Sequence, residues 1–204
     1  MNAPTHALVE TADSAIKRAL SAIKGAVVPQ QLRLNHPGLR KTFRHTYDVT
    51  DAHFYYGAVF CRATLPEEMV TPELSNIRDL LHNTIEELNK LDTQMQAIAT
   101  SNGVQIGHSF NDQLIETQAS TPFSKKYLDI FRKADGYLVL IDSLWIEGVI
   151  ADDQHSKAGS SMCQLCHGVS NRVNDIFRRL LSESNRRRKS QEPQTAPAPN
   201  LTPA

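Results

Sequence analysis

The sequence predicts a mainly α-helical protein with a short N-terminal β element, an α+β chain built on one globular domain. Apolar side chains recur every three or four residues over three long stretches of the C-terminal two thirds, which is typical of amphipathic helices. Polar and apolar side chains alternate over residues 39–50, which is typical of a half-buried strand. An atypical ribbon–helix–helix core, extended by long C-terminal helices, is one architecture that combines these elements.

Residues 39–50 read LRKTFRHTYDVT, with polar side chains at every even position. The odd positions are mostly apolar or aromatic, so one face of the expected strand is buried. Thr50 or Asp51 is expected to cap a short helix that ends near Ala63. Two such strands, paired in a dimer, would form a ribbon that fits the major groove of DNA.

Capping residues mark the ends of the long helices. Threonine followed by proline is a helix start, and glycine favours a helix end. These signals predict helices over residues 71–103 and 121–148, and a last helix from Asp152 or Asp153 to the basic cluster. A second short strand is expected at residues 113–119.

Composition divides the chain into three regions. Residues 1–29 hold an amphipathic segment, residues 30–189 form a single globular, mainly helical domain, and residues 190–204 form a proline-rich tail. We expect the first segment to be a helix that packs on the body or on a partner. The tail has too little apolar bulk to fold and is expected to be disordered.

Length and composition also bound the class of protein. A chain of 204 residues with 40% hydrophobic and 22% charged residues is ordinary for a globular protein that buries a real core. The N-terminus shows no basic region followed by an apolar one, and no apolar run reaches the length of a membrane span. We therefore expect a cytoplasmic protein with no membrane partner, in a compartment that keeps its three cysteines reduced.

The run CQLCH at residues 163–167 has the C-x-x-C-H spacing of covalent haem attachment and half the ligands of a zinc site. Cys166, however, starts a stripe at helical spacing, completed by Val169, Val173, Ile176 and Leu180. Free cysteine packs well as a small buried hydrophobe. No second ligand pair accompanies the motif, so core packing is the favoured interpretation, over a metal site and over haem, and we expect no cofactor.

Catalytic motifs are missing from the sequence. Asp152 and Asp153 precede His155, but acids at a helix start stabilise the cap and the helix dipole. No glycine-rich phosphate loop, nucleophile elbow or H-E-x-x-H motif is present. We expect a protein that is not an enzyme, with no catalytic or metal-binding residues.

Charge is balanced overall but unevenly distributed. Residues 64–100 contain seven acids against two bases, and residues 178–189 contain six bases against one acid. The basic run is either a solvated helix end, where bases suit the dipole, or a set of phosphate contacts. The expected DNA-binding residues are the outward strand side chains, which would meet bases, and the basic run, which would meet phosphates. They are Arg40, Thr42, Arg44 and Thr46, and Arg186, Arg187, Arg188 and Lys189.

The segment ADGYLVLIDSLWIEGVIADDQ (residues 134–154) resembles the AcaB-like transcriptional regulators, which are encoded on conjugative plasmids and integrative elements. The matching features are LIDSLW at 140–145, Gly148 three residues later, and NRV at 171–173 in the following helix. The resemblance covers about residues 40–182. It implies a DNA-binding regulator of transfer genes, dimeric or larger, with an atypical ribbon–helix–helix core. The CQLCH run is no part of this pattern.

We therefore expect a DNA-binding transcriptional regulator of a conjugative or integrative mobile element, which binds double-stranded DNA as a homodimer or larger assembly. The alternative is a helical interaction protein of the conjugation or maintenance apparatus that does not bind DNA. A cysteine-ligated metalloprotein is a more distant third.

Overall fold

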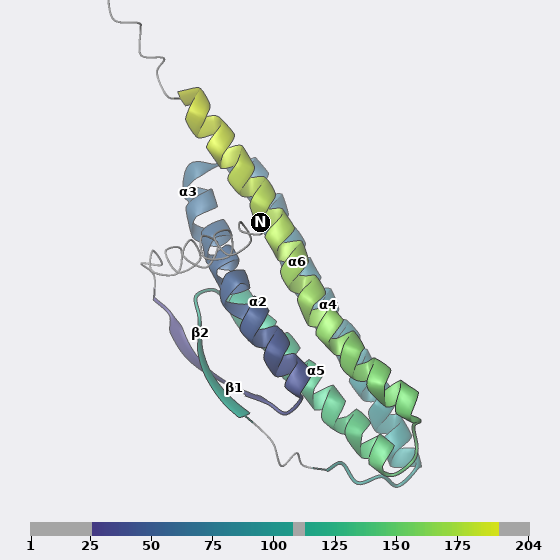
Figure 1. Ribbon diagram of the computed structural model, residues 1–204. Helices are drawn as coiled ribbons and strands as arrows, with labels where there is room; N and C mark the ends of the chain where they lie inside the picture. The colour runs from purple at the N-terminus through teal and green to yellow at the C-terminus, as the bar shows by residue number, and fades with distance from the viewer. Residues whose placement is uncertain (1–25, 108–112, 192–204) are drawn as a thin grey trace, which may run out of the picture.

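The computed structural model describes residues 26–107 and 113–191, which form a bundle of long helices with a two-stranded sheet along one side (Figure 1). The elements, in chain order, are β1 (Val28–Leu34), α2 (Pro37–Tyr55), the π-helical segment η1 (Tyr56–Cys61), α3 (Arg62–Thr64), α4 (Glu67–Ser101), β2 (Gln113–Ala119), α5 (Pro122–Ile146) and α6 (Asp152–Gln191). The predicted fold class, mainly α with a short N-terminal β element, is confirmed. The amphipathic segment predicted at the N-terminus and the tail beyond Gln191 lie outside the described residues.

The elements stack in three layers. The sheet packs on α2 and α5, and α4 and α6 form the layer farthest from the sheet (Figure 1). Helices α4 and α6 are antiparallel, since Arg179 near the end of α6 pairs with Glu73 near the start of α4. None of the described helices contains a stretch long and apolar enough to cross a bilayer.

The two strands pair antiparallel within one chain, with Val28 opposite Ala119 and Leu34 opposite Gln113. β2 has the bounds predicted for it, whereas β1 was missed. Leu32 and Leu34 are fully buried against the helices, and Arg33 between them is exposed. The ribbon is therefore completed inside the chain, and no second copy is needed to form it.

The strand predicted over residues 39–50 is wrong, because these residues form the first two thirds of α2. Leu39, Phe43 and Tyr47 are buried and four residues apart, so they form one stripe of a helix as readily as alternate positions of a strand. The threonines that favoured a strand instead bond within the helix: the Thr46 and Thr50 hydroxyls donate to the carbonyls four residues earlier. The short helix expected up to Ala63 is the continuation of α2 through η1 and α3.

The long helices begin close to the predicted positions. α5 starts at Pro122, and the preceding Thr121 caps it. The Thr121 hydroxyl accepts from the Ser124 N–H, and the Ser124 hydroxyl accepts from the Thr121 N–H. α6 starts at Asp152, as predicted. α4 starts at Glu67 instead of Thr71, because Val70 adds one more buried apolar turn ahead of Pro72. Pro72 cannot donate to the Glu68 carbonyl, and its ring crowds that carbonyl, so it disturbs the helix close to its first turn and not in its middle.

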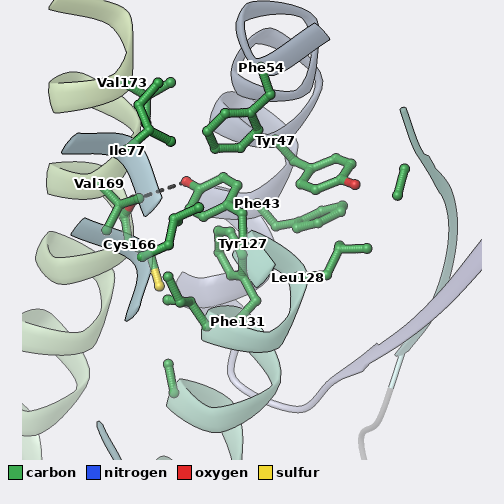
Figure 2. Close-up of a cluster of buried hydrophobic side chains, with 14 of the residues drawn as sticks. Phe43, Tyr47, Phe54, Ile77, Tyr127, Leu128, Phe131, Cys166, Val169 and Val173 are labelled. Carbon is green, nitrogen blue, oxygen red and sulfur yellow. Dashed lines mark hydrogen bonds between the residues drawn. The ribbon is translucent and has the colours of Figure 1, made fainter. Parts of the chain in front are cut away.

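Aromatic side chains from α2 and α5 fill the centre of the core (Figure 2). Phe43 stacks on Tyr47 with ring centroids 4.8 Å apart and meets Phe131 edge to face at 5.2 Å. The buried Tyr127 hydroxyl donates to the Cys166 carbonyl at 2.9 Å, drawn as a dashed line in Figure 2. The α6 stripe that contains Cys166 is buried along its length, which confirms the packing prediction for this cysteine.

Candidate nucleic-acid interface

The exposed face of the β1–β2 ribbon is polar. Gln31 and Arg33 on β1 and Glu116 and Gln118 on β2 point away from the helices, with Gln31 opposite Glu116. Leu114, opposite Arg33, is the apolar member of this face, and it is 46% exposed. A two-stranded ribbon of this kind is one of the two elements narrow enough to enter the DNA major groove.

Hydrogen bonds to both strands fix the ribbon on the bundle. Arg132 on α5 donates to the Gln31 carbonyl at 3.2 Å, and the Tyr47 hydroxyl on α2 donates to the Gln118 carbonyl at 2.8 Å. Pro29, which lies opposite Gln118, has no N–H to offer a neighbouring strand. Side chains of the bundle thus bond to backbone carbonyls on both strands, and Pro29 offers no N–H, so pairing with a further strand along the edges is disfavoured. The polar face of the ribbon is then the surface that a partner can contact.

A buried carboxylate anchors the turn from β1 into α2. Asp135 on α5 is 3% exposed and accepts hydrogen bonds from the backbone N–H groups of Asn35 and His36, each at 2.9 Å. The Asn35 side-chain amide donates to the same carboxylate at 2.7 Å. His36 in turn accepts from the Leu39 N–H and caps α2. The joint therefore holds the ribbon and the first turns of α2 in one fixed arrangement.

At its other end, β2 is tied to α2 by Asp51. This carboxylate is 2% exposed and accepts from the Ser120 N–H at 3.1 Å and from the Ser120 hydroxyl at 2.9 Å. Asp48, one turn earlier and beside the ribbon, has a pKa raised by burial and by the neighbouring Asp51. The acids gather at this end of the ribbon, away from Arg33.

The four residues predicted to meet bases lie on α2, but not on one face. Arg44 is exposed and donates to the Gln113 side chain of β2 at 3.1 Å, and Arg40 lies one turn earlier on the same side of the helix. Thr42 is half-buried. Thr46 is 3% exposed and bonds to the Tyr127 hydroxyl, so the base contact predicted for Thr46 is wrong. Alternate residues share one face of a strand but not of a helix, so these four side chains are not aligned.

Arg33 is an exposed arginine of the ribbon that was not among the predicted DNA-binding residues. It precedes Leu34, the partner of the Gln113 that Arg44 contacts, so Arg33 and Arg44 flank the same end of the ribbon. A signal was available: in VPQQLRL the two leucines alternate with polar residues, as in a half-buried strand. The proline and the separation of almost eighty residues from its partner strand obscured that signal.

The basic end of α6 lies far from the ribbon. The Thr50 hydroxyl on α2, six residues beyond Arg44, lies 2.7 Å from the Ser170 hydroxyl on α6, and Arg186 follows Ser170 by 16 residues, so more than about 24 Å of helix separates Arg44 from Arg186. The structure therefore does not bring the two predicted sets of DNA-binding residues together.

Acids from the same chain partly neutralise the basic end of α6. Arg186 and Arg187 both pair with Glu183, at 3.1 and 3.0 Å, and these contacts lower the pKa of Glu183, the Arg187 hydrogen bond most of all. Arg187 also contacts the Met69 sulfur at 3.2 Å. Arg188 and Lys189 belong to α6, but their side chains lie outside the described part of the chain.

The cysteine motif shows no ligand geometry. Cys166 is fully buried, and burial raises its pKa to about 12, so the group is a thiol and not a thiolate. His167 is exposed on the other side of the helix. Over residues 26–107 and 113–191, no three side chains of the metal-binding types converge as a ligand set.

No protein-family model matches the chain, and no curated protein matches it either. Among solved structures, selenomethionine-containing AcaB from uropathogenic E. coli superposes with a TM-score of 0.77, over 81% of this chain and 86% of the AcaB chain. The chain has the AcaB fold. The two sequences are 17% identical, so the likeness concerns the fold.

Residues 134–154, which carry the sequence resemblance, join two helices of this fold. This segment forms the second half of α5, the loop after it and the first turn of α6. Leu140 and Leu144 are buried there, whereas Trp145 stacks on His155 with ring centroids 4.5 Å apart and donates to Asp152 at 2.7 Å. The tryptophan that carries the resemblance therefore holds the α5–α6 loop and lies far from the ribbon.

Proposed function

We propose that this protein is a non-enzymatic, cytoplasmic DNA-binding regulator of transcription on a conjugative or integrative mobile element, and that the β1–β2 ribbon is its reading surface. Two lines of support lie outside the ribbon. Residues 134–154 resemble the AcaB-like regulators, and the chain has the AcaB fold. The observation that carries the proposal is the exposed polar face of the ribbon, held rigidly on the bundle.

The chemistry of this face suits base edges. Arginine can donate to both acceptors of guanine, and glutamine can pair with adenine, so Arg33, Gln31 and Gln118 are suited to direct readout. The Leu114 side chain can meet a thymine methyl group. Arg40 and Arg44 flank the ribbon on α2 and are assigned to phosphates, which position a protein without reading sequence. The α6 bases Arg186, Arg187, Arg188 and Lys189 would contact phosphates only if the DNA extends past the ribbon.

The test is binding to promoter DNA from the protein's own element, titrated with salt. We expect preference for one promoter fragment over unrelated DNA by a factor on the order of a thousand. Arg33→Ala and Gln31→Ala should reduce that preference, whereas Arg44→Ala should weaken binding to all sequences and flatten the log–log salt slope by about one unit. Lys90→Ala, an exposed base on α4 in the layer away from the sheet, is the matched control. Equal binding of all fragments would contradict the proposal.

One observation favours the alternative, a helical interaction protein. Ile146 and Ile106 are 74% and 52% exposed at the end of the bundle, where the Gly107 N–H donates to Ser143 at 3.0 Å and holds the loop after α4 against α5. Exposed apolar side chains grouped in this way mark protein contacts. The same titration separates the two functions, because an interaction protein would prefer no promoter fragment and the ribbon substitutions would change nothing.

A further inference from the structure

A groove runs between α4 and α6 on the face of the molecule away from the sheet. Two adjoining cavities, of about 580 and 490 Å³, make up the groove and share Leu80, Thr84, Glu87 and Arg172 in their walls. The two helices make few contacts with each other, whereas α4 packs closely on α5 and α6 on α2. The space between α4 and α6 is therefore open along several turns.

The groove has an apolar floor with charged rims. Leu80 and Leu91 on α4 and Leu165 on α6 are half-buried and line it at helical spacing. Ser161 and Arg179 mark its ends on α6, which are 18 residues or about 27 Å apart. Half-buried leucines at helical spacing on α4, with one more facing them from α6, are typical of a helix-packing surface that lacks a partner.

The two rims carry opposite charge. On the α4 rim are Asp79 and Glu87, and on the α6 rim are Arg172 and Arg179, with Asp175 between the two arginines. Arg179 pairs with Glu73 in the same chain at 3.1 Å. Asp79, Glu87 and Arg172 form no ion pair with another described residue.

We propose that a second copy of this chain covers the groove, related by a twofold axis that runs along it, so that α4 of each copy lies over α6 of the other. This rotation places the acidic rim of one copy on the basic rim of the other, and Glu87 opposite the second copy's Arg172. Asp175 then meets the part of α4 that offers the amides of Asn76 and Asn83. A twofold axis across the groove would instead pair α4 with α4 and α6 with α6, which opposes like charges and is disfavoured.

The surface is small for an interface and its rims are charged, which favours a weak dimer. Two helices side by side are about 20 Å wide, so the patch of about 27 Å by 20 Å covers about 540 Å² on each copy, just below the range of standard interfaces. We therefore expect a dimer with a dissociation constant in the micromolar range. The proposal needs no DNA and is independent of the function assigned to the ribbon.

The test is a charge swap between two copies of the full chain, followed by sedimentation in the absence of DNA. Glu87→Arg and Arg172→Glu each place like charges across both halves of the symmetric contact, so each variant alone should dimerise at least tenfold more weakly than the wild type. An equimolar mixture of the two variants restores opposite charges at both contacts. The mixture should therefore form a heterodimer with an affinity close to that of the wild type.

Two controls separate the contact from general damage to the fold. Glu86→Arg changes an exposed neighbour on α4 that does not line the groove, and it should dimerise like the wild type. Recovery in the mixture cannot arise from misfolding or from an ion pair within one chain, because neither chain alone holds both partners. A monomeric wild type at tens of micromolar, or a mixture no stronger than its components, would overturn the proposal and leave the groove to another segment or another protein.

Discussion

At the scale of single residues, Asp135 decides where the ribbon lies. Its carboxylate accepts from two backbone N–H groups and from one side-chain amide at the β1–α2 joint, all at 2.7–2.9 Å. Hydrogen bonds to a buried charged acceptor are among the stronger contributions to stability. When the acceptor is removed, its buried donors stay unsatisfied because water cannot reach them. A single side chain on α5 thus couples the candidate interface to the core.

Replacing Asp135 with asparagine should lower the free energy of unfolding by about 2–3 kcal/mol, because the new amide turns an N–H group toward donors that need an acceptor. Urea unfolding followed by circular dichroism measures this change. Asp129→Asn is the matched control, since Asp129 only pairs with Arg132 at the surface and its loss should cost less than about 1 kcal/mol. Equal effects of the two substitutions would contradict the role given to Asp135.

His53 is expected to make the free energy of unfolding fall as the pH is lowered. Its ring stacks on Phe177 with centroids 4.2 Å apart, and its Nδ1 has no hydrogen-bond partner among the described residues. Burial first, and the nearby Arg178 second, lower its pKa from 6.5 to about 4.

Because the unfolded chain binds this proton more readily, the His53 contribution is complete above pH 6.5 and is lost as the pH falls from about 6.5 to about 4. The loss should approach 3 kcal/mol in the free energy of unfolding. His53→Phe keeps an aromatic ring but removes the titration, so its unfolding free energy should fall less over this range. His82→Phe, at an exposed position on α4, should keep the wild-type slope. Parallel pH curves for wild type and His53→Phe would show that another group carries the effect.

At the scale of elements, one glycine inside α5 and one just after it should respond to alanine substitution in opposite directions. Gly148 follows the end of α5 with a φ of 71°, in the left-handed region that disfavours a Cβ. Gly136 lies inside α5, where an added Cβ would meet nothing within 4 Å. We expect Gly148→Ala to lower the free energy of unfolding by about 1 kcal/mol and Gly136→Ala to raise it by about 1 kcal/mol. Thermal unfolding of the two variants measures both signs, and a shift in the same direction would contradict the assignment.

Elements with local signals could be predicted from the sequence. The Thr121–Pro122 start of α5 and the start of α6 at Asp152 are defined by caps a few residues long, and β2 by its β-forming residues. The apolar side chains of residues 39–50 fit both the two-residue period of a strand and the four-residue spacing of a helix face. Phe43 packs against Phe131 and Tyr47 stacks on Tyr127, and these contacts stabilise the helix. β1 depends on a partner far along the chain, and its only local signal is the alternation of Leu32 and Leu34 with polar residues after a proline.

The candidate interface was predictable only in part, for the same reason. The sequence pointed to arginines near residue 40 and to a ribbon, and the structure places Arg40 and Arg44 beside a ribbon that they do not form. Thr46 was assigned to the surface because alternation was assumed, and the helix turns it toward Tyr127. Arg33 could not be placed next to Arg44 before β1 was known.

At the scale of the whole molecule, the two charged regions of the sequence meet in space. The acidic start of α4 lies beside the basic end of α6, where Arg179 bonds to Glu73 and Arg187 reaches Met69. Part of the basic run is therefore compensated within the chain. This arrangement leaves the sheet on one side of the bundle and helices α4 and α6, with the groove between them, on the other; Figure 1 shows the opposite placement of the sheet and the two helices.

This separation predicts what a dimer would do with DNA. If two copies join through their α4–α6 faces, their ribbons lie on opposite outer sides of the assembly and face apart, so they cannot read adjacent half-sites of one duplex. One dimer should then hold two duplexes or two distant sites together. Beads that carry the operator should capture a second, labelled operator duplex through the wild-type protein. Glu87→Arg should still bind the first duplex, because its ribbon is intact, but should capture the second at least tenfold less. Capture by this variant at the wild-type level would mean that bridging, if it occurs, uses another surface.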